Sequence, residues 1–102
     1  MARGREYGTP FAASSTASGN TTTTVSAIAG KTLYVTDFSG SSDLAGATIQ
    51  VKDGSTVVWQ DRVSNTCPGI YQLSEPLPIA GALTVVVTGT SYAAANVAGY
   101  SL

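Results

Sequence analysis

The chain has 102 residues, five basic and six acidic side chains, a net charge of −1, one cysteine and no histidine. This length fits one domain, and the balanced charge lacks the clustered basic face that nucleic-acid binding needs. A lone cysteine cannot form an internal disulfide, and no apolar run is long enough to cross a bilayer.

The opening 21 residues differ from the remainder in composition. The stretch from 12 to 24 consists almost entirely of Ala, Ser, Thr, Gly and Asn, which offers too little apolar area to fix its own conformation. We therefore predict a flexible, extended N-terminal arm over residues 1–21 and a folded domain over 22–102. Arg3, Arg5, Tyr7, Pro10 and Phe11 are either anchors that dock on a partner or incidental residues of a disordered terminus.

The first body segments predict strands. Thr22–Ile28 is rich in β-branched residues, and Lys31–Ser39 follows a turn at Ala29 and Gly30. Alternation in the second segment places Leu33 and Val35 on one face and Tyr34, Thr36 and Phe38 on the other. Both faces carry apolar groups, which leaves one of them, with Tyr34 and Phe38, available to a partner.

A hairpin is predicted over residues 47–62. Ala47–Lys52 alternates between apolar and polar side chains, and the next two residues are Asp53 and Gly54, which suit a type I′ turn. Ser55–Arg62 returns and carries Trp59. A lone tryptophan at this place is either a core or interface residue or a platform on which a sugar stacks, and we favour the first role.

Three more segments complete an all-β chain. Ile70–Leu73 is a short strand, and residues 75–78 cannot form a central strand because Pro76 and Pro78 lack ladder donors. Ala82–Thr88 alternates again. Tyr92–Leu102 closes the domain, and we predict a strand there despite its alanine content. About seven to eight short antiparallel strands at this spacing predict a small jelly roll or β-sandwich.

Catalytic and metal-binding patterns are missing from the sequence. Without histidine, the commonest general base and the histidine-dependent triads are excluded, and one cysteine cannot build a zinc site. Cys67 has no nearby basic residue to activate its thiol. Asp37 and Asp61 are the only acids that we considered as a paired carboxylate site. We therefore expect a non-enzymatic protein without catalytic residues, cofactor or metal.

Four segments carry a resemblance. Val25–Lys31 reads V-x-A-I-A-G-K, Ile49–Thr56 reads I-x-V-K-x-G-S-T, and the two closing segments, Ala82–Gly89 and Ala94–Tyr100, read A-L-T-V-x-V-T-G and A-A-N-V-x-G-Y. In this order they resemble small jelly-roll virion proteins of tailed bacteriophages, the capsid decoration or cement proteins.

The resemblance implies a protein that is made in the host cytoplasm and adheres to the capsid surface. Its expected partners are the major capsid protein and copies of itself in a homotrimer, with neither nucleic acid nor membrane. Relatives in phage tails and adhesins keep a carbohydrate-binding module as the alternative. On the arm hypothesis, a chain without residues 1–21 would still fold and form a trimer but would bind the capsid weakly.

Overall fold

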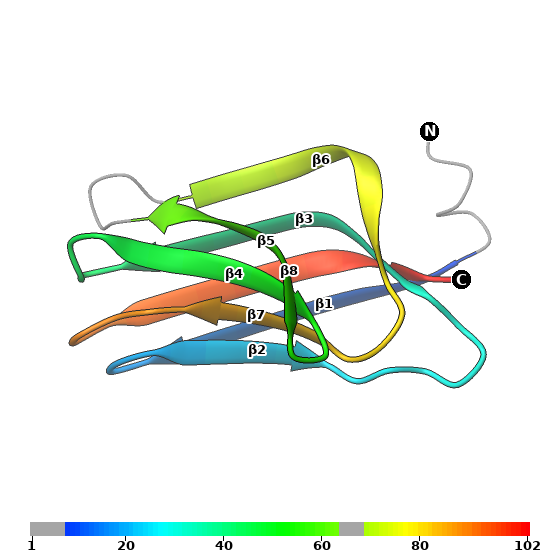
Figure 1. The fold of residues 1–102 in the computed structure, drawn as a ribbon, viewed down its shortest axis with the longest axis horizontal. Helices are drawn as coiled ribbons and strands as arrows, with labels where there is room; N and C mark the ends of the chain where they lie inside the picture. The colour runs from blue at the N-terminus through cyan, green and yellow to red at the C-terminus, as the bar shows by residue number, and fades with distance from the viewer. Residues whose placement is uncertain (1–7, 64–68) are drawn as a thin grey trace.

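The fold was obtained as a computed structural model, which describes residues 8–63 and 69–102. The described chain forms two antiparallel four-stranded sheets packed face to face (Figure 1). Sheet A has the order β1 (Thr9–Ala17), β8 (Ala93–Ser101), β3 (Leu33–Ser42), β6 (Gly69–Ile79). Sheet B has the order β2 (Thr21–Val25), β7 (Leu83–Val87), β4 (Ala47–Asp53), β5 (Thr56–Val63). Apart from the β4–β5 hairpin, consecutive strands alternate between the two sheets, which is the topology of a jelly roll. This confirms the predicted fold class.

The core lies between the sheets and follows the period-two pattern of the sequence. Along β4, Ala47, Ile49 and Val51 are completely buried, whereas the residues between them are partly exposed. The same alternation buries every second residue of β7. The final segment is strand β8 and not a helix, as the sequence analysis predicted.

The hairpin between β4 and β5 is confirmed, but its turn is not the type predicted. Asp53 pairs with Thr56, so Gly54 and Ser55 are the central residues of the turn. Gly54 has a φ of 62°, and no described residue other than glycine has a positive φ. A type I′ turn needs positive φ at both central positions, whereas type II′ needs it only at the first. The backbone therefore follows the type II′ pattern.

A β-bulge in β3 reverses the predicted orientation of Phe38. The register against β8 passes from Val35 opposite Gly99 directly to Asp37 opposite Ala98, which leaves Thr36 as the extra residue. An extra residue shifts the side-chain alternation by one. Phe38 is consequently 2% exposed and lies in the core with Leu33 and Val35.

Strands β3 and β8 also approach each other closely beside this bulge, at Gly99. A Cβ atom added to Gly99 would collide with the carbonyl oxygen of Tyr34 and approach the ring of Phe11. Glycine is therefore required at position 99 by the close approach of a neighbouring backbone. The space above Gly99 is filled by the ring of Phe11.

The expected arm is largely a strand, which corrects the domain boundary. Residues 9–17 form β1 and pair along their whole length with β8, while Phe11 and Ala13 pack against the core. This stretch has little apolar area of its own, but β8 supplies backbone hydrogen-bond partners along its whole length. Residues 1–7 lie outside the described part of the chain. Removal of residues 1–21 would delete an integral strand, so that prediction no longer follows.

Strand β6 is longer than predicted, yet it obeys the proline rule. It runs from Gly69 to Ile79 at the edge of sheet A, and β3 is its only partner among the strands that the structure describes. Pro76 and Pro78 therefore lie in an edge strand, where a missing ladder donor is tolerated.

Candidate docking surface

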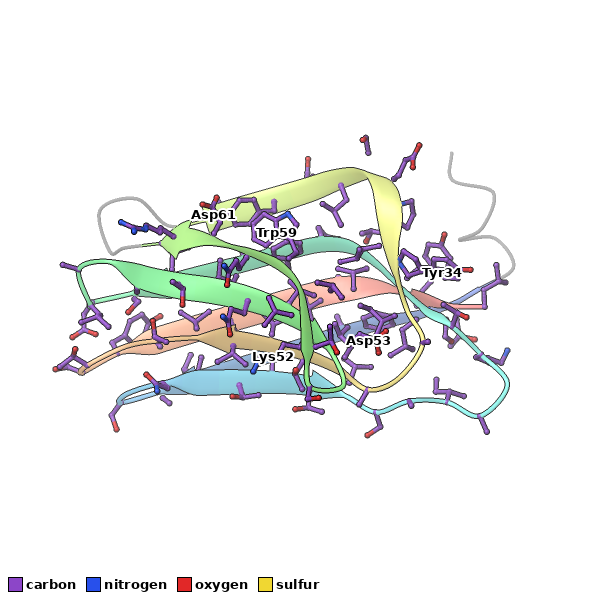
Figure 2. The ribbon with its side chains drawn as sticks, viewed as in Figure 1. Tyr34, Lys52, Asp53, Trp59 and Asp61 are labelled. Carbon is purple, nitrogen blue, oxygen red and sulfur yellow. The ribbon has the colours of Figure 1, made fainter. Side chains whose placement is uncertain are left out.

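The structure does not gather the predicted partner-binding residues into one site. Arg3, Arg5 and Tyr7 lie outside the described residues. Tyr34 stacks on Tyr100, with ring centroids 5.2 Å apart, and Figure 2 shows it well away from Trp59.

Three other predicted contact residues take different positions. Pro10 is exposed on β1, and Phe11 beside it is half-buried against the core. Phe38 is buried, so its side chain belongs to the core and not to an exposed face. Only some of the predicted residues therefore remain accessible on the isolated chain.

An aromatic cluster of Phe38, Trp59 and Tyr71 ties the two sheets together. Trp59 projects from β5 and meets Phe38 edge-to-face at 4.7 Å and Tyr71 at 4.6 Å between ring centroids. Phe38 and Tyr71 are stacked at 5.1 Å. The Tyr71 hydroxyl donates to an Asp61 carboxylate oxygen at 3.0 Å. Trp59 is thus a half-buried bridge between the sheets, in line with the role that we favoured for it.

This cluster closes one side of the sandwich, which we call the β5/β6 edge (strands Thr56–Val63 and Gly69–Ile79). Strand β5 is irregular, because its register with β4 shifts between Val51 and Lys52. Asp61 lies opposite Ile49 and therefore shares the core-facing side of β5. Bulges, prolines and inward-pointing charges are devices that keep an edge strand from pairing with another chain. This edge combines all of them.

The opposite side, the β1/β2 edge (strands Thr9–Ala17 and Thr21–Val25), has a different character. The register between β1 and β8 is uninterrupted over nine residues, and that between β2 and β7 over five. Residues 8–30 contain no ionisable side chain. Apart from Pro10, this edge carries none of the protective devices found on the other side.

A cluster of hydroxyl groups joins the two strands of the β1/β2 edge. The Ser15 hydroxyl hydrogen-bonds those of Thr21 at 2.8 Å and Thr23 at 2.6 Å. Thr23 also donates to the carbonyl oxygen of Ala95 at 3.3 Å. Thr21 and Thr23 are buried, and their satisfied hydroxyls explain how so polar an edge can hold together.

A hollow of about 450 Å³ lies on the outer face of sheet A. Its lining mixes apolar side chains with polar ones, and the polar ones are Ser14, Asp37, Ser39, Gln72 and Asn96, together with Tyr71. The Asn96 amide donates to the Ser39 hydroxyl at 3.2 Å. Trp59 is not among its lining residues, so the hollow lacks the tryptophan platform that the sequence analysis considered.

Two aspartates near strand ends, Asp43 and Asp53, fix neighbouring loops by accepting hydrogen bonds from their backbone N–H groups. The Asp43 carboxylate accepts four hydrogen bonds of 2.8–3.0 Å from the N–H groups of Thr90, Ser91 and Tyr92. These bonds, that of Thr90 foremost, keep the pKa of Asp43 below its ordinary value. Asp53 likewise accepts from the N–H groups of Ala80 and Gly81, at 3.2 and 2.8 Å.

The arrangement offers no assembled reactive centre among the residues that the structure describes. Asp37 lines the hollow on sheet A, whereas Asp61 does not and accepts a hydrogen bond from Tyr71. The two candidate carboxylates therefore do not share one site. Within ranges 8–63 and 69–102, no three metal-ligating side chains come together. These ranges also contain no helix of the length and apolarity needed to span a membrane.

Comparisons with known proteins leave the family open, because no family model and no curated protein matches the sequence. The segments that carry the phage resemblance fall mainly in the core of the jelly roll. Ile49–Thr56 contains most of β4, the turn and the first residue of β5, while the two closing segments contain β7 and most of β8.

Proposed function

We propose that this chain is a structural virion protein, a decoration subunit that binds the outer surface of a phage capsid and stabilises the head. In this role it contacts the major capsid protein and copies of itself in a homotrimer. The observation that carries the proposal is the β1/β2 edge, a whole side of a jelly roll without charge and almost without protection. Such an edge is a liability unless a neighbour covers it.

The composition supports an assembled role. Only 11% of the residues are charged, less than half of the usual share of about 25%. A surface poor in Lys and Glu loses little hydration free energy on docking, and such residues are depleted where proteins meet. The proposed role is mechanical, without catalysis, cofactor, nucleic acid or membrane.

The second candidate is a tail or host-adhesion module that binds carbohydrate. The hollow on sheet A favours it, because Asp37, Gln72 and Asn96 place polar side chains around a concave surface. Against it, the ring of Trp59 packs on Phe38 and Tyr71 and is not laid open as a shelf. A glycan array with the purified protein distinguishes the two, since a specific hit that Asn96→Ala abolishes would favour the adhesin.

The test of the decoration role is electron cryomicroscopy of particles isolated from the cells that make this chain. The proposal predicts density for the eight-stranded body on the outer shell, at three-fold or quasi-three-fold positions. Particles that lack the chain are expected to release their DNA at a lower temperature. Density in a tail fibre, or particles devoid of the chain, would refute the assignment to the head.

A further inference from the structure

Among the described strands none pairs with the outer side of β1, toward which part of its backbone directs hydrogen-bonding groups. The carbonyl oxygen of Ala98 accepts from the Thr36 hydroxyl and therefore points toward β3. In an antiparallel ladder, the N–H and C=O of one residue point to the same side. Ala12, which lies opposite Ala98, must then direct its own N–H and C=O away from β8.

The alternation of the strand extends this to other residues of β1. Ser14 and Thr16 have the same parity as Ala12, so their backbone groups also face the open side. Pro10 shares that parity, and its missing N–H agrees with the preference of proline for the solvent side of an edge strand. The side chains of Ala12, Ser14 and Thr16 are exposed and small enough to let a neighbouring backbone approach.

We propose that the β1/β2 edge is the docking site for a second copy of this chain, with β1 of one copy pairing antiparallel to β2 of the next. The inference rests on the self-association in the proposed function and names the strands that would carry it. Each junction would join sheet A of one copy to sheet B of its neighbour. Three such junctions around one axis would cover the six β1 and β2 strands of the three copies.

Charge and direction favour a second copy as the occupant. Both strands lie in the stretch 8–30, which has no ionisable side chain, so neither would strand an unpaired charge at the junction. A short turn, residues 18–20, connects β1 to β2, and the two strands run in opposite directions in Figure 1. Rotation about an axis parallel to the strands therefore brings β2 of one copy antiparallel to β1 of another.

The opposite side of the sandwich is a poor alternative. A strand added to β5 would meet the bulge at Val58, the extra residue between the partners of Val51 and Lys52, and one added to β6 would meet Pro76 and Pro78. The exposed Val57 and Val58, each 40% accessible, provide apolar contact there but no regular ladder. They nevertheless supply a matched control position.

The experiment compares three lysine variants of the full chain by sedimentation velocity over a wide concentration range. Ser14→Lys alters β1, Thr24→Lys alters β2 and Val58→Lys alters β5, all at exposed strand positions with the same change of charge. Circular dichroism verifies that each variant is folded. We expect Ser14→Lys and Thr24→Lys each to weaken self-association by about 30-fold or more, and Val58→Lys to assemble like the unaltered chain.

Mixing the two edge variants tests the pairing itself. The Thr24→Lys copy keeps an intact β1 and the Ser14→Lys copy an intact β2, so one junction can form between them but the ring cannot close. The mixture should therefore contain heterodimers that neither variant forms alone. Pairing of β1 with β1 would instead leave Thr24→Lys fully assembled, which would overturn the proposed junction.

Two other outcomes would also overturn it. One is dissociation by Val58→Lys with Ser14→Lys still assembled, and the other is an unaltered chain that stays monomeric at every concentration. Binding of the same proteins to isolated particles separates this inference from the decoration role. A monomer that still coats the outer shell would refute the junction and keep the decoration assignment, whereas a trimer that coats no particle would do the reverse.

Discussion

The two open sides of this sandwich are built on different principles. The β5/β6 edge is bulged, contains two prolines, carries Asp61 on its inner side and is closed by three aromatic rings. The β1/β2 edge is regular, neutral and held inside by hydroxyl groups. The first is closed by contacts within one chain, whereas the second leaves the outer side of two regular strands without a described neighbour. Low apolar content thus need not indicate disorder when a strand pairs along its whole length with a distant strand.

The largest expected change in stability is at the β5/β6 edge. Trp59→Ala should remove the bridge between the sheets and lower the free energy of unfolding by about 3 kcal/mol, as for other large-to-small aromatic changes. Because Trp59 is the only tryptophan, the measurement is urea denaturation followed by far-ultraviolet circular dichroism. Val58→Ala on the same strand is the control, and an equal loss there would contradict the role of the cluster.

The next effect falls on β1. Phe11→Ala should lower stability by about 2 kcal/mol, because Phe11 is half-buried against the core and fixes β1 over Gly99. Since β1 is the proposed junction, self-association should weaken as well. Pro10→Ala, at the adjacent exposed position, should leave stability nearly unchanged. If a folded Phe11→Ala chain assembled fully, the packing of Phe11 on the core would not be needed for self-association, contrary to this prediction.

The hydroxyl cluster should give a smaller change. Thr23→Val keeps the shape of the side chain but removes its bonds to Ser15 and Ala95, which should cost about 1 to 2 kcal/mol because buried partners lose their bond. Thr22→Val, at an exposed position of the same strand, is the control. Equal thermal melting temperatures for the two variants would show that the cluster is dispensable.

A still smaller effect is expected for the loop at residues 90–92, which Asp43 holds, and it depends on pH. The pKa of Asp43 is lowered in the folded protein, so its stabilising contribution is present above the ordinary value of 3.8 and is lost as the pH falls through the folded pKa. Asp43→Asn should therefore destabilise the protein slightly at neutral pH and flatten the dependence of the melting temperature on pH in acid. An unchanged acid profile would contradict this account.

The loop held by Asp43 is linked to the β1/β2 edge. Its neighbour Gly89 donates to the Asn20 side chain at 3.0 Å, and Asn20 lies in the turn between β1 and β2. Asp43 and Asn20 thus fix the end of the β1/β2 edge from outside. Asn20→Ala should leave the fold intact and loosen only this turn, detectable as faster amide exchange at Gly89.

The sequence predicted those parts of the fold in which local pattern and tertiary environment agree. The hairpin around Gly54, the alternation of β4 and β7 and the edge position of Pro76 and Pro78 follow from side-chain period and backbone chemistry alone. The orientation of Phe38 did not follow, because one extra residue at Thr36 reverses the pattern and has no sequence signature.

The site was harder to predict for a related reason. Residues 9–17 were expected to contact a partner, but as a flexible arm, since their composition carries little apolar area. Their order depends on β8, more than 70 positions later in the chain, and a ladder between distant segments leaves no local signal. The contrast between the two sandwich edges likewise appears only once the sheets are assembled.

Amide hydrogen exchange along β1 tests the central claim most directly. In the assembled protein, the amides of Ala12, Ser14 and Thr16 should be protected and should lose that protection on dilution, while those of Ala13 and Ser15, which bond to β8, stay protected throughout. Rapid exchange of Ala12, Ser14 and Thr16 in a protein that is demonstrably assembled would show that the copies meet elsewhere.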